Sequence, residues 1–315
     1  MKCQKINNYK LTGSIHTLQI KSADIPEIPA ELQECISSST RKNHGKIEAI
    51  SIINPNKLLG DCFSFTEFED CFTSILKECG VGNYRLMRVD FRMDSYESEF
   101  YRVYAKLHKY LLSCLAVTYN VRNAYKTENL FSNRLLSMAI KNDYLQCECY
   151  DRAAKSELTE NHEEKAKSRL EERTVSKSWR LIESKKIENK SESNLEDIKR
   201  EFVTEWYKRW QKAVATDNLK EVWSKYNCDL ARIYQEDKAA YPVKFRSLTD
   251  FLIQNQDCIF CHRQLVNLLE LIGVDNPESM ARNHKKRYGI EYFSRSDLKK
   301  AVDEIKRATE KFFSE

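Results

Sequence analysis

The spacing of apolar residues changes near residue 190, and this change constrains the fold more than any other feature of the chain. Before it, several segments alternate apolar and polar residues, which is typical of strands with one buried face. From Leu195 onward, apolar residues recur near positions i, i+3, i+4 and i+7, as in amphipathic helices. The change predicts an α+β fold, with an antiparallel-rich sheet and packed helices over 1–190 and an all-helical region over 191–315.

Regular elements should be long, because only 7 Gly and 5 Pro interrupt 315 residues. In the first half we expect strands in the segments GSIHTLQI from Gly13, KIEAISII from Lys46, YRLMRVDFRMD over 84–94 and YLQCECY from Tyr144. Helices are expected in SFTEFEDCFTSILKECG, which ends at Gly80, and in the segment from Ser98. The charged stretch 158–190 should be partly helical and end in a linker.

Composition narrows the class of protein. Charged residues make up 31% and hydrophobic ones 41%, the range of a globular protein. A net charge of +5 permits nucleic-acid binding without requiring it. No apolar run approaches a membrane span and no signal core is present, so we expect a cytoplasmic protein without a membrane partner. The 11 cysteines are an odd number at irregular positions and are expected to be reduced and mostly buried.

The string CIFCH, over 258–262, has two interpretations. C-x-x-C can form half of a zinc site, and C-x-x-C-H can attach haem. The string also lies within FLIQNQDCIFCHRQLVNLLELI, whose apolar spacing favours one helix packed in the core. Because no second ligand pair has suitable spacing, the core helix is the preferred interpretation.

Two of the expected strands carry polar side chains on one face. The first presents Asp90 and Asp94 with Arg88 and Arg92, and the second presents Glu148 and Tyr150. If the strands are neighbours, carboxylates and a phenol converge, and carboxylates suit Mg²⁺ or Mn²⁺. The alternative is a solvated sheet face whose opposite charges form cross-strand pairs.

The order of four strings resembles that of the Rep_trans family of plasmid rolling-circle replication initiators and related conjugative-element relaxases. These strings are INPNKL (53–58), RVDFRMD (88–94), CYDRAAKSE (149–157) and RLEER (169–173). The resemblance implies a metal-dependent enzyme that nicks and rejoins one strand at an origin. In this family a tyrosine becomes bonded to the 5′-phosphate and leaves a 3′-hydroxyl for DNA synthesis.

The resemblance also implies residue roles. Tyr150 would be the nucleophile, with Arg88 and Arg152 at the scissile phosphate; Arg152 stands where the family has lysine. The implied Mg²⁺ or Mn²⁺ ligands are Asp90, Asp94, Glu157 and Glu171, and implied DNA contacts are Lys155 and Arg169. The implied partners are origin DNA with an exposed single strand, a host helicase and a second copy of the chain. The stretch around Glu171 looks more helical than extended.

The helical half offers further candidates for DNA contact. Lys285, Lys286 and Arg287 lie in NHKKRYG, which is either a solvated loop or a phosphate-binding segment. Trp206 and Trp210 are four residues apart in EWYKRWQK, and a core position is favoured over base stacking. Two other functions stay open: a non-catalytic DNA-binding initiator or copy-control protein, and a protein-interaction module.

Overall fold

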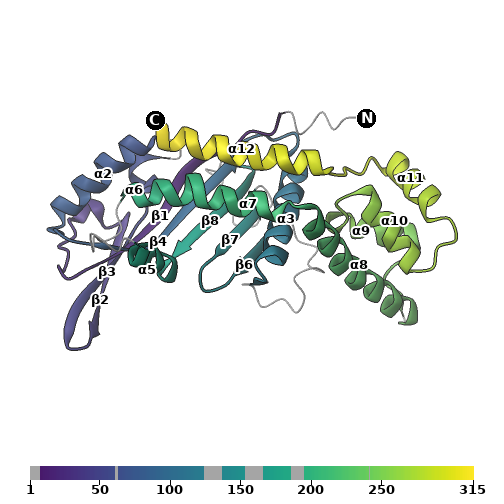
Figure 1. Ribbon diagram of the computed structural model, residues 1–315, viewed down its shortest axis with the longest axis horizontal. Coiled ribbons are helices and arrows are strands. Elements are labelled where there is room, and N and C mark those ends of the chain that lie inside the picture. Colours follow the sequence, from purple (N-terminus) through teal and green to yellow (C-terminus); the bar gives the residue numbers. More distant parts are fainter. Residues whose placement is uncertain (1–7, 61–62, 124–136, 153–165, 186–194, 241) are drawn as a thin grey trace.

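The computed structural model describes residues 8–60, 63–123, 137–152, 166–185, 195–240 and 242–315 (Figure 1). Within these ranges, no helix combines the length and the apolar character needed to cross a bilayer. The nine cysteines in the described part are free thiols, and most are buried, as the sequence predicts.

One eight-stranded sheet forms the centre of the first half. Its strand order is β2-β3-β1-β4-β8-β7-β6-β5, and every paired neighbour is antiparallel. The predicted antiparallel α+β class is therefore confirmed. The strands are β1 (Thr12–Ser22), β2 (Ile36–Asn43), β3 (Lys46–Ile53), β4 (Arg85–Ser95), β5 (Arg122–Asn123), β6 (Met138–Lys141), β7 (Gln146–Asp151) and β8 (Ser168–Val175).

Helices flank the sheet and continue beyond it (Figure 1). They include a short π-helical segment, η3, and two 3₁₀ turns, η2 and η4. Their bounds are α1 (Asn56–Leu59), α2 (Phe65–Glu78), α3 (Tyr101–Thr118), α5 (Ser176–Lys185), α6 (Leu195–Arg200), η3 (Glu201–Trp206), α7 (Tyr207–Ala213), α8 (Thr216–Ala239), α9 (Leu248–Gln254), α10 (His262–Leu271), α11 (Pro277–Tyr288), α12 (Arg295–Ser314), η2 (Ala30–Leu32) and η4 (Gln256–Cys258).

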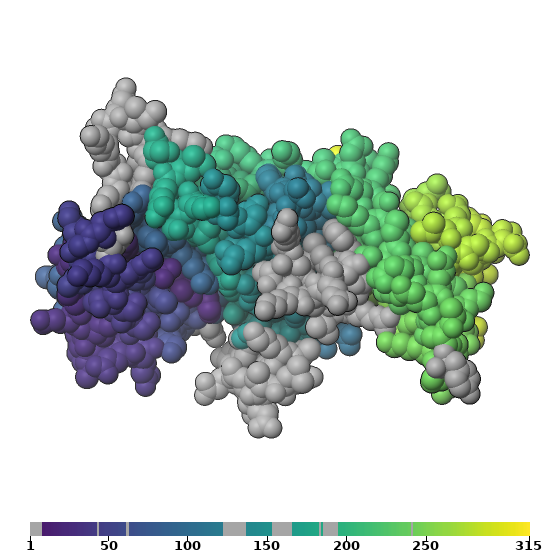
Figure 2. Space-filling view, turned by 90° about the horizontal axis from the view of Figure 1, so that it is seen from below, coloured from purple at the N-terminus to yellow at the C-terminus, as the bar shows by residue number. Residues whose placement is uncertain are grey.

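The C-terminal helix packs back onto the sheet. Phe91 of β4 contacts Phe312 and Phe313 of α12, with ring centroids 5.5 and 5.6 Å apart, and Phe202 of η3 at 5.2 Å. Helices α12, α6 and α7 run across the sheet, whereas α8–α11 gather at the end of the molecule far from β2 and β3 (Figures 1 and 2). The proposed domain boundary near 190 lies outside the described residues and stays a prediction.

Local sequence signals account for the ends of the clearest helices. Ser64 and Glu67 form a capping box that begins α2, and Ser294 and Asp297 form one that begins α12. The chain turns away after α2 at Gly80, whose φ of 69° favours glycine. Trp206 and Trp210 are buried in the core, as predicted.

Two local predictions are wrong, and the loop that was one of two interpretations of a third segment is not formed. RLEER belongs to strand β8 and not to a helix, because pairing with β4 on one side and β7 on the other outweighs helical propensity. The segment 251–272, expected to be one helix, is divided among α9, η4 and α10, because Cys261 caps a new helix. NHKKRYG is not a loop: it forms the last turns of α11 and ends at Gly289.

Candidate functional site

Four adjacent strands, β1, β4, β8 and β7, present polar side chains on the side of the sheet opposite the phenylalanine core. Residues paired across these strands form three rows, which together we call the polar face. The rows are Thr12–Asp94–Arg169–Tyr150, Ser14–Arg92–Glu171–Glu148 and Thr17–Asp90–Arg173–Gln146. The strands of Asp90 and Tyr150 are thus not direct neighbours, since β8 lies between them.

A β-bulge adds a histidine to this face. The pairing of β1 with β4 shifts between Ile15 and Thr17, which leaves His16 as the extra residue. Ile15 and Leu18 are buried in the core, whereas His16 and Thr17 are half-buried. The bulge therefore allows two successive residues to lie outside the core. Their side chains form a hydrogen bond, with Thr17 Oγ1 and His16 Nδ1 3.0 Å apart.

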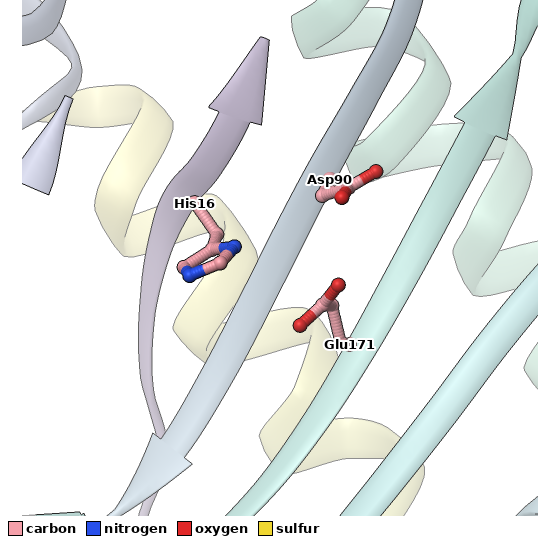
Figure 3. Close-up of side chains that lie close together, drawn as sticks. All are labelled: His16, Asp90 and Glu171. Carbon is pink, nitrogen blue, oxygen red and sulfur yellow. The ribbon is translucent and has the colours of Figure 1, made fainter. Parts of the chain in front are cut away.

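His16, Asp90 and Glu171 converge from three different strands (Figure 3). One ligand atom from each lies within 4.8 Å of the others. Burial lowers the pKa of His16 to about 4, so the imidazole is neutral at pH 7 and keeps a lone pair for a metal. An imidazole and two carboxylates are a donor set that fits a divalent cation such as Mn²⁺.

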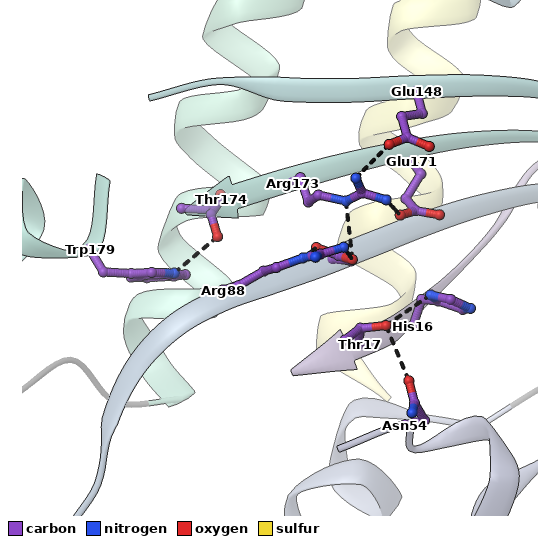
Figure 4. Close-up of polar contacts among 10 residues, drawn as sticks. His16, Thr17, Asn54, Arg88, Glu148, Glu171, Arg173, Thr174 and Trp179 are labelled. Carbon is purple, nitrogen blue, oxygen red and sulfur yellow. Dashed lines mark hydrogen bonds and ion pairs between the residues drawn. The ribbon is translucent and has the colours of Figure 1, made fainter. Parts of the chain in front are cut away.

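Arginines balance the charge of the carboxylates (Figure 4). The Arg173 guanidinium contacts Glu148 and Glu171 at 2.5 Å each and Asp90 at 3.1 Å. Arg88 Nε donates to Asp90 at 2.7 Å. Burial raises the pKa of Asp90 to about 6, against the opposing effect of these arginines. Burial also tends to raise the pKa of Glu171, but the opposing effects of Arg173 and His16 outweigh it. The pKa of Glu171 therefore lies below its usual value.

The row that contains Tyr150 holds a second ion pair. Arg169 donates from Nε and Nη2 to the two oxygens of Asp94, at 2.6 and 2.8 Å. Arg92 Nε lies 3.5 Å from Asp94 and donates to Ser14 at 2.8 Å. Tyr150 is half-buried beside Arg169 on the neighbouring strand. The bidentate ion pair between Arg169 and Asp94 holds the guanidinium in one orientation.

The NPNKL segment lies over the same face. Thr17 donates to the Asn54 amide oxygen at 3.3 Å. With its amide group oriented to satisfy both neighbours, Asn56 donates to the His16 carbonyl at 3.3 Å and accepts from Arg92 at 3.2 Å. Asn54 and Asn56 of INPNKL, one of the four strings that carry the family resemblance, therefore contact the candidate site.

The polar face is not the solvated surface that alternation suggests. Asp90, Arg92 and Asp94 are at most 2% exposed. They belong to the central strand β4, and polar or charged side chains of Ser14 in β1, Arg169 and Arg173 in β8 and Asn56 in α1 contact them. Buried charges of this kind persist because each is paired and hydrogen-bonded.

The other predicted site residues lie away from the His16–Asp90–Glu171 cluster or outside the described residues. Arg152 directly follows β7 and is half-buried, whereas Lys155 and Glu157 are outside the described residues. Lys285, Lys286 and Arg287 are exposed on α11, at the end of the molecule far from β2 and β3. Asp94 is one row away from Glu171 and pairs with Arg169; its role as a metal ligand stays a prediction.

Sequence reasoning missed His16, Arg173 and the two asparagines Asn54 and Asn56. Arg173 stood in the quoted RLEER string, and the asparagines stood in NPNKL, so a signal was present for them. For His16 the only signal was an expected strand, because a bulge cannot be recognised in strict alternation.

Comparisons with known proteins add little to this description. A search of the solved structures finds a similar chain, described as a rolling circle replication initiator protein from Geobacillus stearothermophilus, with 10% identity and a TM-score of 0.28. The match covers 56% of this chain and 78% of that chain. No family model matches the sequence, and no curated protein matches it. Because both identity and TM-score are low, we base the function on the polar face.

Proposed function

We propose that this protein is a metal-dependent DNA nicking-closing enzyme that initiates replication or mobilisation of a genetic element. The observation that carries the proposal is the joint placement of Tyr150, Arg169 and the His16–Asp90–Glu171 cluster on one polar face. The family resemblance supplies the reaction and the tyrosine's role. A host helicase and a dimeric state are further expectations from that resemblance.

In the proposed reaction, the Tyr150 hydroxyl oxygen attacks a phosphodiester of origin DNA. A tyrosyl–phosphorus bond forms as the bond from phosphorus to the 3′-oxygen breaks, and the released 3′-oxygen takes up a proton. The reverse attack rejoins the strand. In this proposal Arg88, Arg152 and Arg169 contact the phosphate, because guanidinium groups match its oxygens in charge and geometry.

The residues present fit a divalent cation. A neutral imidazole and two carboxylates face one another within 4.8 Å, and the nitrogen ligand favours Mn²⁺ over Mg²⁺, which prefers oxygen. Such an ion supplies positive charge that polarises the scissile phosphate and favours the phenolate of tyrosine, whose free pKa is about 10. The remaining predicted ligands, Asp94 and Glu157, stay candidates.

One observation favours the non-catalytic alternative, a DNA-binding initiator or copy-control protein. Asp90, Asp94, Glu148 and Glu171 are each paired with an arginine. A balanced ion-pair network of this kind can exist for structural reasons alone. The alternative predicts a salt-reversible DNA complex and no covalent adduct.

The decisive experiment is a nicking assay. Supercoiled DNA that carries the protein's own gene and its flanks is incubated with purified protein and Mn²⁺, beside Tyr150→Phe. The matched control is Tyr144→Phe, an exposed phenol that precedes the same strand. We expect relaxed DNA and a covalent adduct with wild type and the control, but not with Tyr150→Phe. Nicking by Tyr150→Phe would exclude this nucleophile, and specific binding without nicking would favour the alternative.

A further inference from the structure

A basic cavity of about 860 Å³ lies in the helical region, away from the polar face. Side chains of α8, α10, α11 and the beginning of α12 line it, together with Tyr110 of α3. Helices α8, α10 and α11 lie at the end of the molecule far from β2 and β3 (Figure 2). Its volume lies within the usual range of ligand sites, about 300–1,000 Å³.

The charge of the cavity wall is strongly positive. The basic side chains that line it are Lys220, Arg263, Lys285, Arg295 and Lys300. The one carboxylate in the wall, Asp297, accepts hydrogen bonds from the Ser294 backbone N–H and hydroxyl and is therefore engaged in the helix cap. The N-termini of α10 and α12 both border the cavity, which adds partial positive charge. An anionic ligand is expected here.

Aromatic side chains line the same cavity, so the ligand also has flat or apolar parts. Trp223 donates to the Tyr110 hydroxyl at 2.6 Å, which holds the indole in place. The Tyr292 hydroxyl is buried and has no hydrogen-bond partner among the described residues. Nucleotides combine both properties, because they carry negatively charged phosphates and flat bases that stack on aromatic side chains.

A second hollow, of about 460 Å³, adjoins the first and shares Lys220, Trp223 and Arg263 with it. Asn227 lines this hollow and is 4% exposed. Its Nδ2 donates to the Gln264 carbonyl at 2.9 Å, whereas its Oδ1 has no partner among the described residues. A buried amide oxygen without a partner is rare and indicates that an N–H donor, such as a base amino group, can bind there.

We propose that the two hollows bind single-stranded nucleic acid, with backbone phosphate among Lys220, Arg295 and the helix N-termini and a base against Trp223. The proposal builds on the proposed function, since nicking exposes a single strand. A continuous site on both sides of Trp223 spans more than one nucleotide, which favours a strand over a free nucleotide. Asn227 then accepts from a base.

The first test measures binding of a labelled oligodeoxynucleotide of about 12 nucleotides by fluorescence anisotropy. Lys220→Ala/Arg295→Ala is compared with Lys225→Ala/Lys299→Ala, which removes two positive charges from the same two helices outside the cavity. We expect the first pair to weaken binding about 10-fold and to lower the salt slope by about 1.4, and the control to match wild type. Equal effects of the two double variants would overturn the proposal.

The second test uses intrinsic fluorescence. Trp179, Trp206 and Trp210 are at most 1% exposed, which leaves Trp223 as the tryptophan that a ligand can reach. The oligonucleotide should quench the emission, and Trp223→Phe should abolish the quenching while the oligonucleotide still binds. Quenching by thymidine monophosphate but not by the oligonucleotide would overturn the strand assignment, as would absence of quenching by either.

These tests are independent of catalysis at the polar face. If wild type quenches and binds as expected but no DNA is nicked, the cavity assignment stands and the enzymatic function fails. If Tyr150-dependent nicking is observed while the cavity variants bind as wild type does, only the cavity assignment fails.

Discussion

Arg169 donates hydrogen bonds to both carboxylate oxygens of Asp94, at 2.6 and 2.8 Å, and both residues lie in the cross-strand row that ends at Tyr150. Both partners of this pair are nearly inaccessible to solvent. Asp94 therefore fixes the direction of the Arg169 guanidinium, whose residue is paired with Tyr150 across β8 and β7, and the ion pair links stability of the sheet to the chemistry proposed for it.

Asp94→Asn should destabilise the protein and impair nicking together. Removal of one charge from a buried pair leaves the other uncompensated, and we expect a loss of roughly 3 kcal/mol in the free energy of unfolding. Denaturant unfolding measures this loss. The control is Asp143→Asn, whose ion pair with Lys177 is exposed and should leave the midpoint unchanged. An unchanged midpoint for Asp94→Asn would show that the pair does not support the fold.

His16→Ala should weaken Mn²⁺ binding, because it deletes the only nitrogen ligand of the cluster formed with Asp90 and Glu171. We expect the dissociation constant for Mn²⁺, measured by titration calorimetry, to rise by at least about 10-fold. His44→Asn, in an exposed turn at φ 47°, is the matched control. Chelation of the metal should stop nicking by wild type. Unaltered Mn²⁺ affinity in His16→Ala would rule out this cluster.

Lys106 should make stability depend on alkaline pH. Its ammonium is buried and donates to the Glu291 carbonyl at 3.1 Å, and burial lowers its pKa to about 8 from a usual 10.5. Between these values the unfolded chain binds more protons than the folded one, so the free energy of unfolding rises with pH. Lys106→Met should remove this rise, whereas exposed Lys299→Met should keep it. Parallel pH profiles for wild type and Lys106→Met would refute the effect.

Phe313→Ala should destabilise the sheet as well as α12. Its ring packs on Phe91 of the central strand β4 and on Phe65 of α2, with centroids 5.6 and 4.8 Å apart. Loss of a buried phenylalanine costs about 3–5 kcal/mol, and Phe313→Leu should cost less because it leaves a smaller cavity. Circular dichroism and tryptophan fluorescence should report one coincident transition. Separate transitions would indicate that the helical region folds independently of the sheet.

The sequence by itself determined the elements whose local signals agree with their surroundings. Alternation over 84–94 predicted β4, and helical spacing with a stop at Gly80 predicted α2. The burial of Trp206 and Trp210 followed from their spacing on one helical face. In these cases hydrophobic periodicity and capping are local properties, so a single sequence is sufficient to recognise them.

Only the tertiary structure decided how the candidate site is assembled. RLEER became a strand because β4 and β7 pair with both of its edges. A bulge in β1 brought His16 toward Asp90 and Glu171, residues more than seventy positions away in sequence. Burial of Asp90 required arginines from its own strand and from the neighbouring one. Strand order, bulges and ion pairing between distant residues depend on packing energies that no local pattern records.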